Sequence, residues 1–226
     1  RSVADAVEAV LRRTPVGRPL RILEIGAGTG GTTRHVVRAL TDSDEPAEVE
    51  YHVTDVSGLF VERARRRFAD APWVRFHTFD LDRPPAEQDV EIGSFDLVVA
   101  ANCIHAARDL TGAVRGIAEL LRPGGLLVAV EVFAPHRWFD LTVGLTDGWW
   151  HFTDAELRGS YPCVSPDTWR DVLNGAGFEE IRVIPLADVS DADGIASTGQ
   201  GLVVAVRGAS RLDGPWLVVG RAGGLA

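Results

Sequence analysis

The sequence predicts an α/β protein in which a mostly parallel β-sheet is layered with helices on both faces. Apolar runs of strand length alternate along the chain with segments of helical periodicity, and the connections between them are short. This alternation is typical of βαβ units. Hydrophobic residues make up 46% of the 226 residues and charged residues 24%, close to the average of globular domains. The composition therefore excludes disordered, collagen-like and coiled-coil chains.

The first four strands are expected at short apolar runs of the kind that a parallel sheet buries. They cover residues 20–25, 50–54, 73–79 and 94–101. Helical periodicity predicts helices before, between and after the first two of these strands, over residues 3–11, 29–40 and 58–68. Ser57 stands just before the last of these helices, and serine is a favoured N-cap residue.

The next part of the chain predicts a helix over residues 110–121 and a fifth strand over 126–132. The turn Pro123-Gly124-Gly125 is expected to separate them. The alternation then stops for about thirty residues, which is long for a connection inside a compact domain. This stretch, residues 133–163, is rich in aromatic side chains, so we expect it to form an ordered cap. Its aromatic residues are Phe133, Trp138, Phe139, Trp149, Trp150, Phe152 and Tyr161.

The last predicted helix covers residues 165–176. Ser165 is its expected N-cap, Pro166 suits its first position, and Gly177 lies just past its end. Two further strands are expected over residues 180–185 and 202–207, joined by an Asp- and Gly-rich loop over 188–199.

One core over residues 1–208 is therefore expected, with the cap inserted at about 133–163. Residues 209–226 contain a fresh strand pattern followed by a glycine turn. They are interpreted either as the start of a following domain or as an edge strand or tail. The chain begins at Arg1 and contains no Met, which suggests a piece of a longer polypeptide.

The charge balance argues against a nucleic-acid partner. Lys and Arg number 23 against 32 Asp and Glu, a net charge of −9, without the basic stripe that phosphates need. No run of 18 apolar residues and no signal peptide is visible, so we expect no membrane partner. The two cysteines, Cys103 and Cys163, form no metal-ligand pattern, so no metal site is expected. They favour a reducing, cytoplasmic location.

The first strand runs into a glycine-rich turn. Gly26, Gly28 and Gly31 formally match the dinucleotide pattern G-x-G-x-x-G, and Gly30 adds a fourth glycine. Glycines allow a tight turn and a close approach of a ligand to the backbone. The pattern alone is a weak signal, so its neighbours decide the interpretation.

Three acidic residues stand at or near the ends of successive strands beside this turn. Glu24 is placed to pair with a cation or a polar tail, Asp55 to bind both hydroxyls of a ribose, and Asp80 to accept from an adenine amine. Ligands of open parallel sheets bind outside these strand ends. Acids here would repel a pyrophosphate, which disfavours a nicotinamide-dependent reductase. They suit a cationic, phosphate-free adenosine ligand, namely S-adenosylmethionine.

The chain resembles the class I S-adenosylmethionine-dependent methyltransferases over about residues 20–208. More narrowly, it is similar to the C-methyltransferase domains of modular polyketide synthases. The stretches that carry the likeness are LEIGAGTGGTT (23–33), TDVS (54–57), FDLVVAANCIH (95–105), LRPGG (121–125) and GLTDGWW (144–150). The last of these is the most specific to the subgroup.

This resemblance implies a Rossmann-like, seven-stranded sheet of order 3-2-1-4-5-7-6 with the last strand antiparallel. It also implies that residues 209–226 resemble the entry to a ketoreductase region. Leu81 and Asn102 join the expected cofactor site, Asn102 either lining it or holding the turn. The chain departs from relatives that carry a helical lid before the first strand, since only about one helix precedes Leu20.

The resemblance implies C-methylation of a β-ketoacyl thioester on an acyl carrier protein, beside neighbouring synthase domains. The α-carbon must first lose a proton, and His is the usual general base near neutral pH. His105 follows the fourth strand, and Glu131 lies near the end of the fifth. If these strands are neighbours the side chains can meet, and Glu131 would orient the imidazole. Such a pair is the catalytic dyad of the family.

The cap is expected to supply Trp149 and Trp150 to cover the methyl donor and exclude water, with plain packing as the alternative. His151 is kept as a possible substrate contact, and Cys103 as a buried, inert thiol. Three other functions stay open beside C-methylation: O-methylation of a hydroxyl or enol, a non-catalytic methyltransferase scaffold and, disfavoured, a nicotinamide-dependent reductase.

Overall fold

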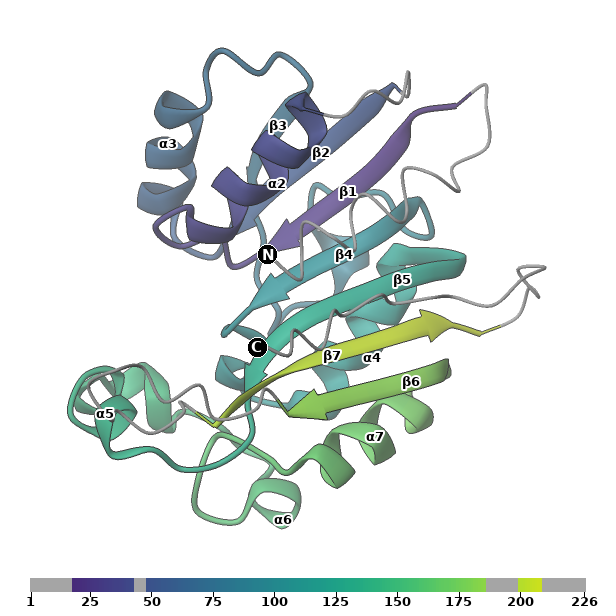
Figure 1. The fold of residues 1–226 in the computed structure, drawn as a ribbon. Coiled ribbons are helices and arrows are strands. Elements are labelled where there is room, and N and C mark those ends of the chain that lie inside the picture. Colours follow the sequence, from purple (N-terminus) through teal and green to yellow (C-terminus); the bar gives the residue numbers. More distant parts are fainter. Residues whose placement is uncertain (1–17, 43–47, 186–198, 209–226) are drawn as a thin grey trace, which may run out of the picture.

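The computed structural model describes residues 18–42, 48–185 and 199–208. Within them, strands form one sheet that helices cover on both faces (Figure 1). The strands are β1 (Leu20–Ile25), β2 (Val49–Asp55), β3 (Val74–Thr78), β4 (Phe95–Ala101), β5 (Leu121–Val132), β6 (Phe178–Pro185) and β7 (Gln200–Arg207). The helices are α2 (Gly31–Thr41), α3 (Gly58–Arg67), α4 (Leu110–Leu120), α5 (Arg137–Asp140), α6 (Ala155–Arg158) and α7 (Pro166–Gly175). Short 3₁₀ turns cover Pro85–Glu87, Ile104–Ala106, Val143–Leu145 and Asp147–Trp150.

The sheet has the order β3-β2-β1-β4-β5-β7-β6, which confirms the expected topology. Neighbouring strands are parallel except at β7, which runs antiparallel to both β5 and β6. The order reverses between β1 and β4, whose arrowheads reach the same edge in Figure 1. Ligands of open α/β sheets bind at such a reversal point, outside the carboxyl ends of the strands.

Two hydrophobic layers hold the helices on the sheet. Because side chains alternate along a strand, Val98 and Val99 of β4 point to opposite faces. Val98 belongs to the layer that contains Ile117 of α4 and Trp169 of α7. Val99 belongs to the other layer, with Val36 of α2. All five side chains are fully buried, so each face of the sheet has its own core.

Most element boundaries differ from the prediction by one or two residues, and two of the differences have a clear physical cause. Helix α2 begins at Gly31 rather than at residue 29, because Gly30 has φ +78°, outside the helical region. Helix α4 ends at Leu120, and β5 begins at Leu121, before the Pro-Gly-Gly turn. Leu121 pairs with Phe95 across the sheet, and a register shift follows before the main ladder. Strand pairing therefore ends the helix earlier than the proline does.

The two predicted serine caps have different outcomes. Ser165 accepts a hydrogen bond from Thr168 N at 3.2 Å, and Gly177 has φ +83° past the helix end, as expected. Ser57 occupies the N-cap position of α3, but its side chain makes no capping hydrogen bond. Its backbone N–H donates instead to Asp55 Oδ1 at 2.8 Å. Ser57 thus begins the helix with its carbonyl, which accepts from Val61 N at 3.2 Å, but its side chain does not cap it.

The cap over residues 133–163 is ordered, as predicted, and consists of α5, α6 and short 3₁₀ turns. It follows β5 at the carboxyl edge of the sheet, where Figure 1 labels α5. The predicted helix at 3–11, residues 188–198 of the predicted loop and the segment 209–226 lie outside the described residues. Within the described ranges, no helix is long and apolar enough to cross a lipid bilayer.

Candidate active site

The glycine turn after β1 needs glycine for two reasons. Gly26, Gly28 and Gly30 have φ of +70°, +52° and +78°, where side chains with a Cβ are strained. A Cβ on Gly26 would also lie 2.6 Å from the Cβ of Cys103, so the turn passes directly against the chain after β4. The turn therefore lies between the first and fourth strands, at the reversal point of the sheet.

Asp55 is tied to the glycine turn by its carboxylate. Parallel pairing brings Val53 level with Glu24, so β2 continues for two residues and brings Asp55 beside the turn. Asp55 Oδ2 accepts from Gly28 N at 2.8 Å, and Oδ1 accepts from Ser57 N at 2.8 Å. The side chain is held at both oxygens, and each oxygen keeps further acceptor capacity.

Glu24 lies under the turn, almost fully buried. Its Oε2 accepts from Tyr51 Oη at 2.5 Å and from Thr33 Oγ1 at 2.7 Å. Burial raises the pKa of the Glu24 carboxyl, and the two hydroxyl donors oppose that rise. Burial, followed by the Glu24 charge, raises the pKa of Tyr51 well above its usual value. The backbone N–H of Thr33 also acts against the rise in the Glu24 pKa.

Asp80 lies two residues beyond β3, in a connection that Gln88 holds. The Gln88 side chain accepts from Asp80 N and donates to Asp80 O, both at 2.8 Å. Asp80 Oδ1 accepts from Asp82 N at 2.9 Å. Leu81 is half-buried and packs against the core on the α4 face. The connection thus keeps a defined conformation without regular secondary structure.

Asn102 occupies a strained turn directly after β4. Its φ of +52° is uncommon for a residue other than glycine. Asn102 N donates to Val130 O at 2.7 Å, and its Oδ1 accepts from Gln200 Nε2 at 3.3 Å. The side chain is exposed. The sequence left two roles open for Asn102, lining the cofactor site or holding the turn, and its backbone geometry agrees with the second.

His105 and Glu131 meet, as the neighbouring strands allow. β4 and β5 pair up to Ala101 and Val130, so Glu131 extends one position beyond the ladder. His105 lies on the 3₁₀ turn after β4, and its Nδ1 is 2.5 Å from Glu131 Oε2. The imidazole is 4% exposed and the carboxylate 0%. A buried carboxylate is costly unless paired, and this one has a partner.

Backbone amides complete the surroundings of Glu131. Its Oε1 accepts from Ile104 N at 2.8 Å and from Cys103 N at 3.2 Å. Because the Glu131 carboxylate accepts at both oxygens, Nδ1 donates to Oε2, so Nε2 is the nitrogen that can accept a proton. No partner for Nε2 occurs among the residues that the structure describes. Burial, reinforced by the Glu131 charge, raises the pKa of the Cys103 thiol well above its usual value, which matches the expected inert thiol.

The cap brings Trp149, but not its two neighbours, against the imidazole. The ring centroids of Trp149 and His105 are 5.1 Å apart in an edge-to-face arrangement. Trp149 is buried and also stacks on Phe139. Trp150 is 45% exposed and donates from Nε1 to Gly144 O at 2.9 Å within the cap. His151 is exposed.

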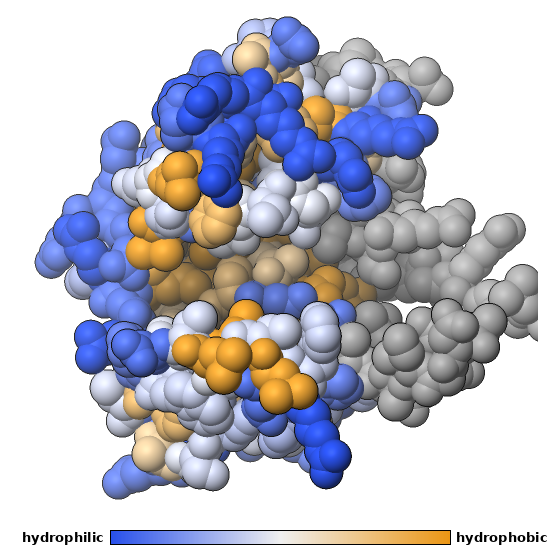
Figure 2. Space-filling model, turned by 90° about the vertical axis from the view of Figure 1, so that its left-hand side faces the viewer, coloured by the Kyte–Doolittle hydropathy of each residue, from blue (hydrophilic) through white to orange (hydrophobic). Residues whose placement is uncertain are grey.

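The space-filling view looks onto this edge of the sheet (Figure 2). A hollow with an apolar interior lies between the upper part, where α2 and α3 lie, and the lower part, which includes the cap. Hydrophilic side chains gather on the upper part. The glycine turn and the His105 turn, which pack against each other, belong to this edge.

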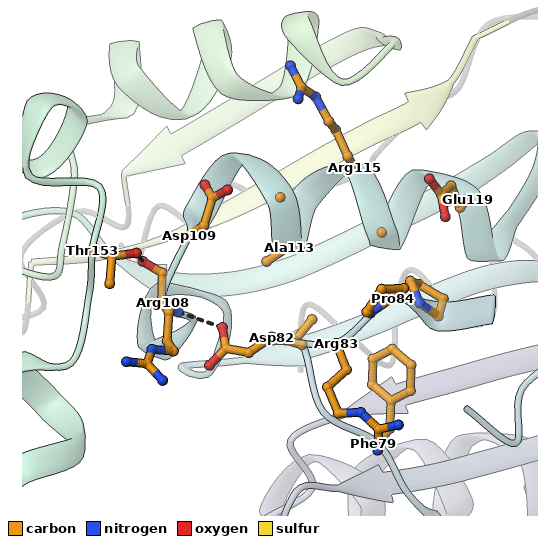
Figure 3. Close-up of a pocket in the computed structure, with 14 residues that line it drawn as sticks. Phe79, Asp82, Arg83, Pro84, Arg108, Asp109, Ala113, Arg115, Glu119 and Thr153 are labelled. Carbon is orange, nitrogen blue, oxygen red and sulfur yellow. Dashed lines mark hydrogen bonds between the residues drawn. The ribbon is translucent and has the colours of Figure 1, made fainter. Parts of the chain in front are cut away.

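A second space lies on the α4 side of the connection after β3 (Figure 3). Its volume is about 470 Å³, and its lining includes Phe79, Arg83 and Arg108. The backbone N–H of Arg108 donates to Asp82 Oδ1 at 2.6 Å, which links the two walls. Of the expected cofactor residues only Leu81 lines this space. The glycine turn, Asp55 and His105 do not line it.

The sequence did not predict two buried residues that hydrogen-bond to site residues. Tyr51 holds Glu24 from a position inside β2, and Arg158 of the cap contacts the backbone of the His105 turn. No spacing or motif distinguishes either residue, because both act over long sequence separations. In the described part of the chain, no cluster of His, Cys, Asp or Glu could hold a metal ion.

Comparison with known proteins gives the class of the chain. Residues 23–127 match the family model of a methyltransferase domain. Methyltransferase calH of Penicillium decumbens is 41% identical over 166 residues, covering 73% of this chain and 45% of calH. Non-reducing polyketide synthase ausA of Penicillium brasilianum is 38% identical over 176 residues, covering 78% of this chain and 7% of ausA. The chain thus spans less than half of each of these relatives.

Solved structures agree with this class. The CurJ carbon methyltransferase superposes with a TM-score of 0.77 at 36% identity, over 88% of this chain and 51% of that one. The trans-methyltransferase CalH, solved in complex with SAH, gives 0.76 at 33% identity, over 91% and 57%. The chain belongs to the class I S-adenosylmethionine-dependent methyltransferases. Within that class it is similar to the methyltransferase regions of polyketide synthases.

Proposed function

We propose that this chain methylates the α-carbon of a β-ketoacyl thioester that is tethered to an acyl carrier protein. The observation that carries the proposal is the buried His105–Glu131 pair, which leaves one imidazole nitrogen without a described partner beside the glycine turn. Carbon acids need such a base, whereas many oxygen nucleophiles are already reactive. The similarity to a carbon methyltransferase supports the choice of carbon as acceptor.

The chemistry of the donor set fits S-adenosylmethionine. Carboxylates and glycine backbone at the sheet edge suit a cationic ligand that carries hydroxyl and amine donors. In this proposal the Asp55 carboxylate accepts from the ribose hydroxyls, Asp80 from the adenine amine, and Glu24 from the ligand's ammonium group. The full set of proposed cofactor residues is Glu24, Gly26, Gly28, Gly30, Asp55, Asp80, Leu81 and Asn102.

When bound, S-adenosylmethionine supplies an electrophilic methyl group, which ends on the substrate carbon. His105 Nε2 takes the α-proton, and the electron pair of that C–H bond remains on the substrate as an enolate. Glu131 stays ionised, keeps the proton of Nδ1 in place and stabilises the imidazolium that forms. The proton leaves Nε2 for solvent after methyl transfer, so the base is restored.

The cap has two proposed tasks in this reaction. Trp149 covers the imidazole and keeps water from the enolate, which water would otherwise protonate. Trp150 and His151 lie on exposed parts of the same turn, where they can contact a long substrate arm. The partner that delivers the arm is the carrier protein, through its phosphopantetheine group. Neighbouring synthase domains are further proposed partners, because relatives include polyketide synthases.

The proposed domain arrangement is a methyltransferase core over residues 1–208, followed by a linker or the start of a ketoreductase-like region over 209–226. The sequence similarity to ausA, which is a synthase many times longer than this chain, supports a multidomain context.

The test is product analysis with a β-ketoacyl thioester of pantetheine and S-adenosylmethionine. We expect a product heavier by one methyl group that has lost an exchangeable α-proton, measured by mass spectrometry after incubation in D₂O. A methyl group on oxygen instead would identify an O-methyltransferase. No product, with saturable cofactor binding by calorimetry, would identify a non-catalytic scaffold.

A further inference from the structure

Arg158, the last residue of α6, is a buried cation behind the turn that carries His105. Its side chain is 0% exposed. Nη1 donates to His105 O at 2.6 Å, and Nη2 donates to Ala107 O at 2.5 Å. Burying a guanidinium is costly unless its donors find partners. Here two of its nitrogens bind alternate carbonyls of the same short turn.

The turn itself uses neither of these two carbonyls. Within the 3₁₀ turn, Ala106 N donates to Cys103 O and Ala107 N donates to Ile104 O. The carbonyls of His105 and Ala107 lie beyond these two acceptors, and Arg158 donates to both. The rigid planar fork of an arginine can bridge two acceptors, whereas a lysine ammonium acts from one point.

Asp154 extends this contact to helix α4. Its Oδ1 lies 2.7 Å from Arg158 Nε as an ion pair, and its Oδ2 accepts from Leu110 N at 2.9 Å. Leu110 is the first residue of α4, whose N-terminal amides need such acceptors. Thr153 N also donates to Arg108 O at 2.8 Å. The cap therefore holds the chain from His105 to the start of α4 at several points.

We propose that Arg158 is a positioning residue, which holds the backbone of His105 so that Nε2 points into the reaction space. The inference rests on the proposed function of His105 as the base. Glu131 holds the imidazole at Nδ1 and Trp149 packs against the ring, but neither contact holds the backbone of His105. Arg158 holds that backbone through the carbonyls of His105 and Ala107. It also joins the cap to the base, so that cap docking and base alignment occur together.

The test is Arg158→Lys in the 226-residue chain. Lysine keeps the charge next to Asp154 but cannot bridge both carbonyls. We expect kcat to fall about 10- to 100-fold, because displacements near 1 Å have effects of this size. The KM for the β-ketoacyl pantetheine thioester and the Kd for S-adenosylmethionine stay within about twofold. Arg137→Lys, an exposed arginine of the same cap, is the matched control and leaves kcat unchanged.

The rate of α-proton exchange in D₂O separates positioning from a merely structural role. Exchange requires the base but not methyl transfer, so Arg158→Lys slows it by the same factor as kcat. In a His105→Ala background the residual exchange rate shows no further loss from Arg158→Lys, because there is no imidazole left to position. An additive loss in that background overturns the inference. A fall in kcat matched by an equal loss of folded protein or of cofactor affinity also overturns it.

The outcome also distinguishes this inference from the proposed function. Wild-type kcat in Arg158→Lys, with an inactive His105→Ala, overturns only the positioning role. Full activity in His105→Ala overturns the proposed function and the inference together. If Arg158→Lys does not fold, Asp154→Asn provides the second variant, because the amide keeps an acceptor for Leu110 N and removes the charge beside Arg158. We then expect a severalfold lower kcat, and an unchanged kcat contradicts the inference.

Discussion

Asp55 and Glu131 are two buried carboxylates at one edge of the sheet, and they differ in a single kind of partner. Each accepts hydrogen bonds from two backbone amides. Asp55 uses both oxygens for them, whereas Glu131 uses one and gives the other to the imidazole of His105. Backbone amides do not titrate, but an imidazole does. In the proposed function, a buried carboxylate with amide partners therefore binds the cofactor at the end of β2, and one with an imidazole partner supports proton transfer at the end of β5.

The largest expected effect comes from removing the titratable partner. His105→Ala should lower the methylation rate on the order of 10⁴-fold, the upper range for a general base. The Kd for S-adenosylmethionine should stay within about twofold, because no proposed cofactor contact is lost. His35→Ala, an exposed histidine of α2, is the control and should keep wild-type activity. Rates are measured by mass spectrometry and affinities by calorimetry. Wild-type turnover in His105→Ala would show that the imidazole partner of Glu131 does not act as the base.

Glu131→Gln should lower the rate next most, on the order of 10³-fold. The glutamine oxygen can still accept from Ile104 N, but its amide nitrogen donates toward Nδ1. That contact favours the tautomer with a proton on Nε2, which blocks the base.

Glu24→Gln is the matched control, because Glu24 is equally buried but has hydroxyl partners. We expect its rate at saturating cofactor to stay within about threefold, with weaker cofactor binding. Equal rate losses in Glu131→Gln and Glu24→Gln would show that the loss of any buried carboxylate lowers the rate, and that the imidazole partner of Glu131 has no special part.

The partners of a buried titratable group should also affect the free energy of unfolding, which a histidine pair away from the site can test. His52 Nδ1 and His77 Nε2 are 2.9 Å apart with stacked rings, and the nearest carboxylate oxygens are farther away, Glu50 Oε2 at 3.8 Å from His52 and Asp89 Oδ2 at 4.0 Å from His77. Burial, followed by the charge of His77, lowers the pKa of His52 to about 4. The unfolded chain, with an ordinary pKa near 6.5, therefore binds more protons between these values. Stability is full above about pH 6.5 and is lost as the pH falls toward 4.

Urea unfolding measures this loss. Between pH 7 and pH 4 we expect the His52 contribution to fall by about 2 kcal/mol, less than the full equivalent of the pKa difference because solvent partly screens the imidazole. His52→Gln should flatten the pH dependence over this range, and the exposed His35→Gln should not. A curve that stays equally steep in His52→Gln would mean that other groups cause the acid sensitivity.

The smallest expected effect is at Asp55. Asp55→Asn keeps one oxygen for a backbone amide but loses the charge and one acceptor. We expect about tenfold weaker binding of S-adenosylmethionine, since each hydrogen bond to a charged group contributes about 1.5 kcal/mol or more. The rate at saturating cofactor should be unchanged, as calorimetry and turnover measurements can establish together. Asp70→Asn, at an exposed position after α3, serves as the control. Unaltered affinity in Asp55→Asn would remove Asp55 from the ribose role.

Much of the fold was predictable because its signals are local. The run at β1 was predicted to the residue, and the topology followed from the family resemblance. The Ser165–Pro166 start and Gly177 end of α7 were also predicted, since caps depend on adjacent residues. The boundary between α4 and β5 was wrong, because Leu121 pairs with Phe95 across the sheet. A strand partner far away in sequence outweighed the local proline signal.

In the candidate site, too, the features that follow from local sequence and strand order were predicted, and those that depend on side-chain packing were not. The glycine turn and the pairing of His105 with Glu131 were predicted, because parallel strands bring their carboxyl ends to one edge. The burial of Glu24 beneath Tyr51 was not, and neither was the contact of Trp149, but not Trp150, with the imidazole. Both depend on side-chain packing that adjacent residues do not specify.

The sequence by itself determined the order of strands and helices, the glycine turn and the chemical types gathered at the sheet edge. It could do so because periodicity, capping and backbone freedom act over a few residues. Only the tertiary structure decided that Arg158 binds the backbone of the His105 turn, 53 residues away in sequence, and that Trp149 packs against the imidazole. Such contacts stabilise the site only after the sheet and cap have come together, since the entropy of closing long loops must first be overcome.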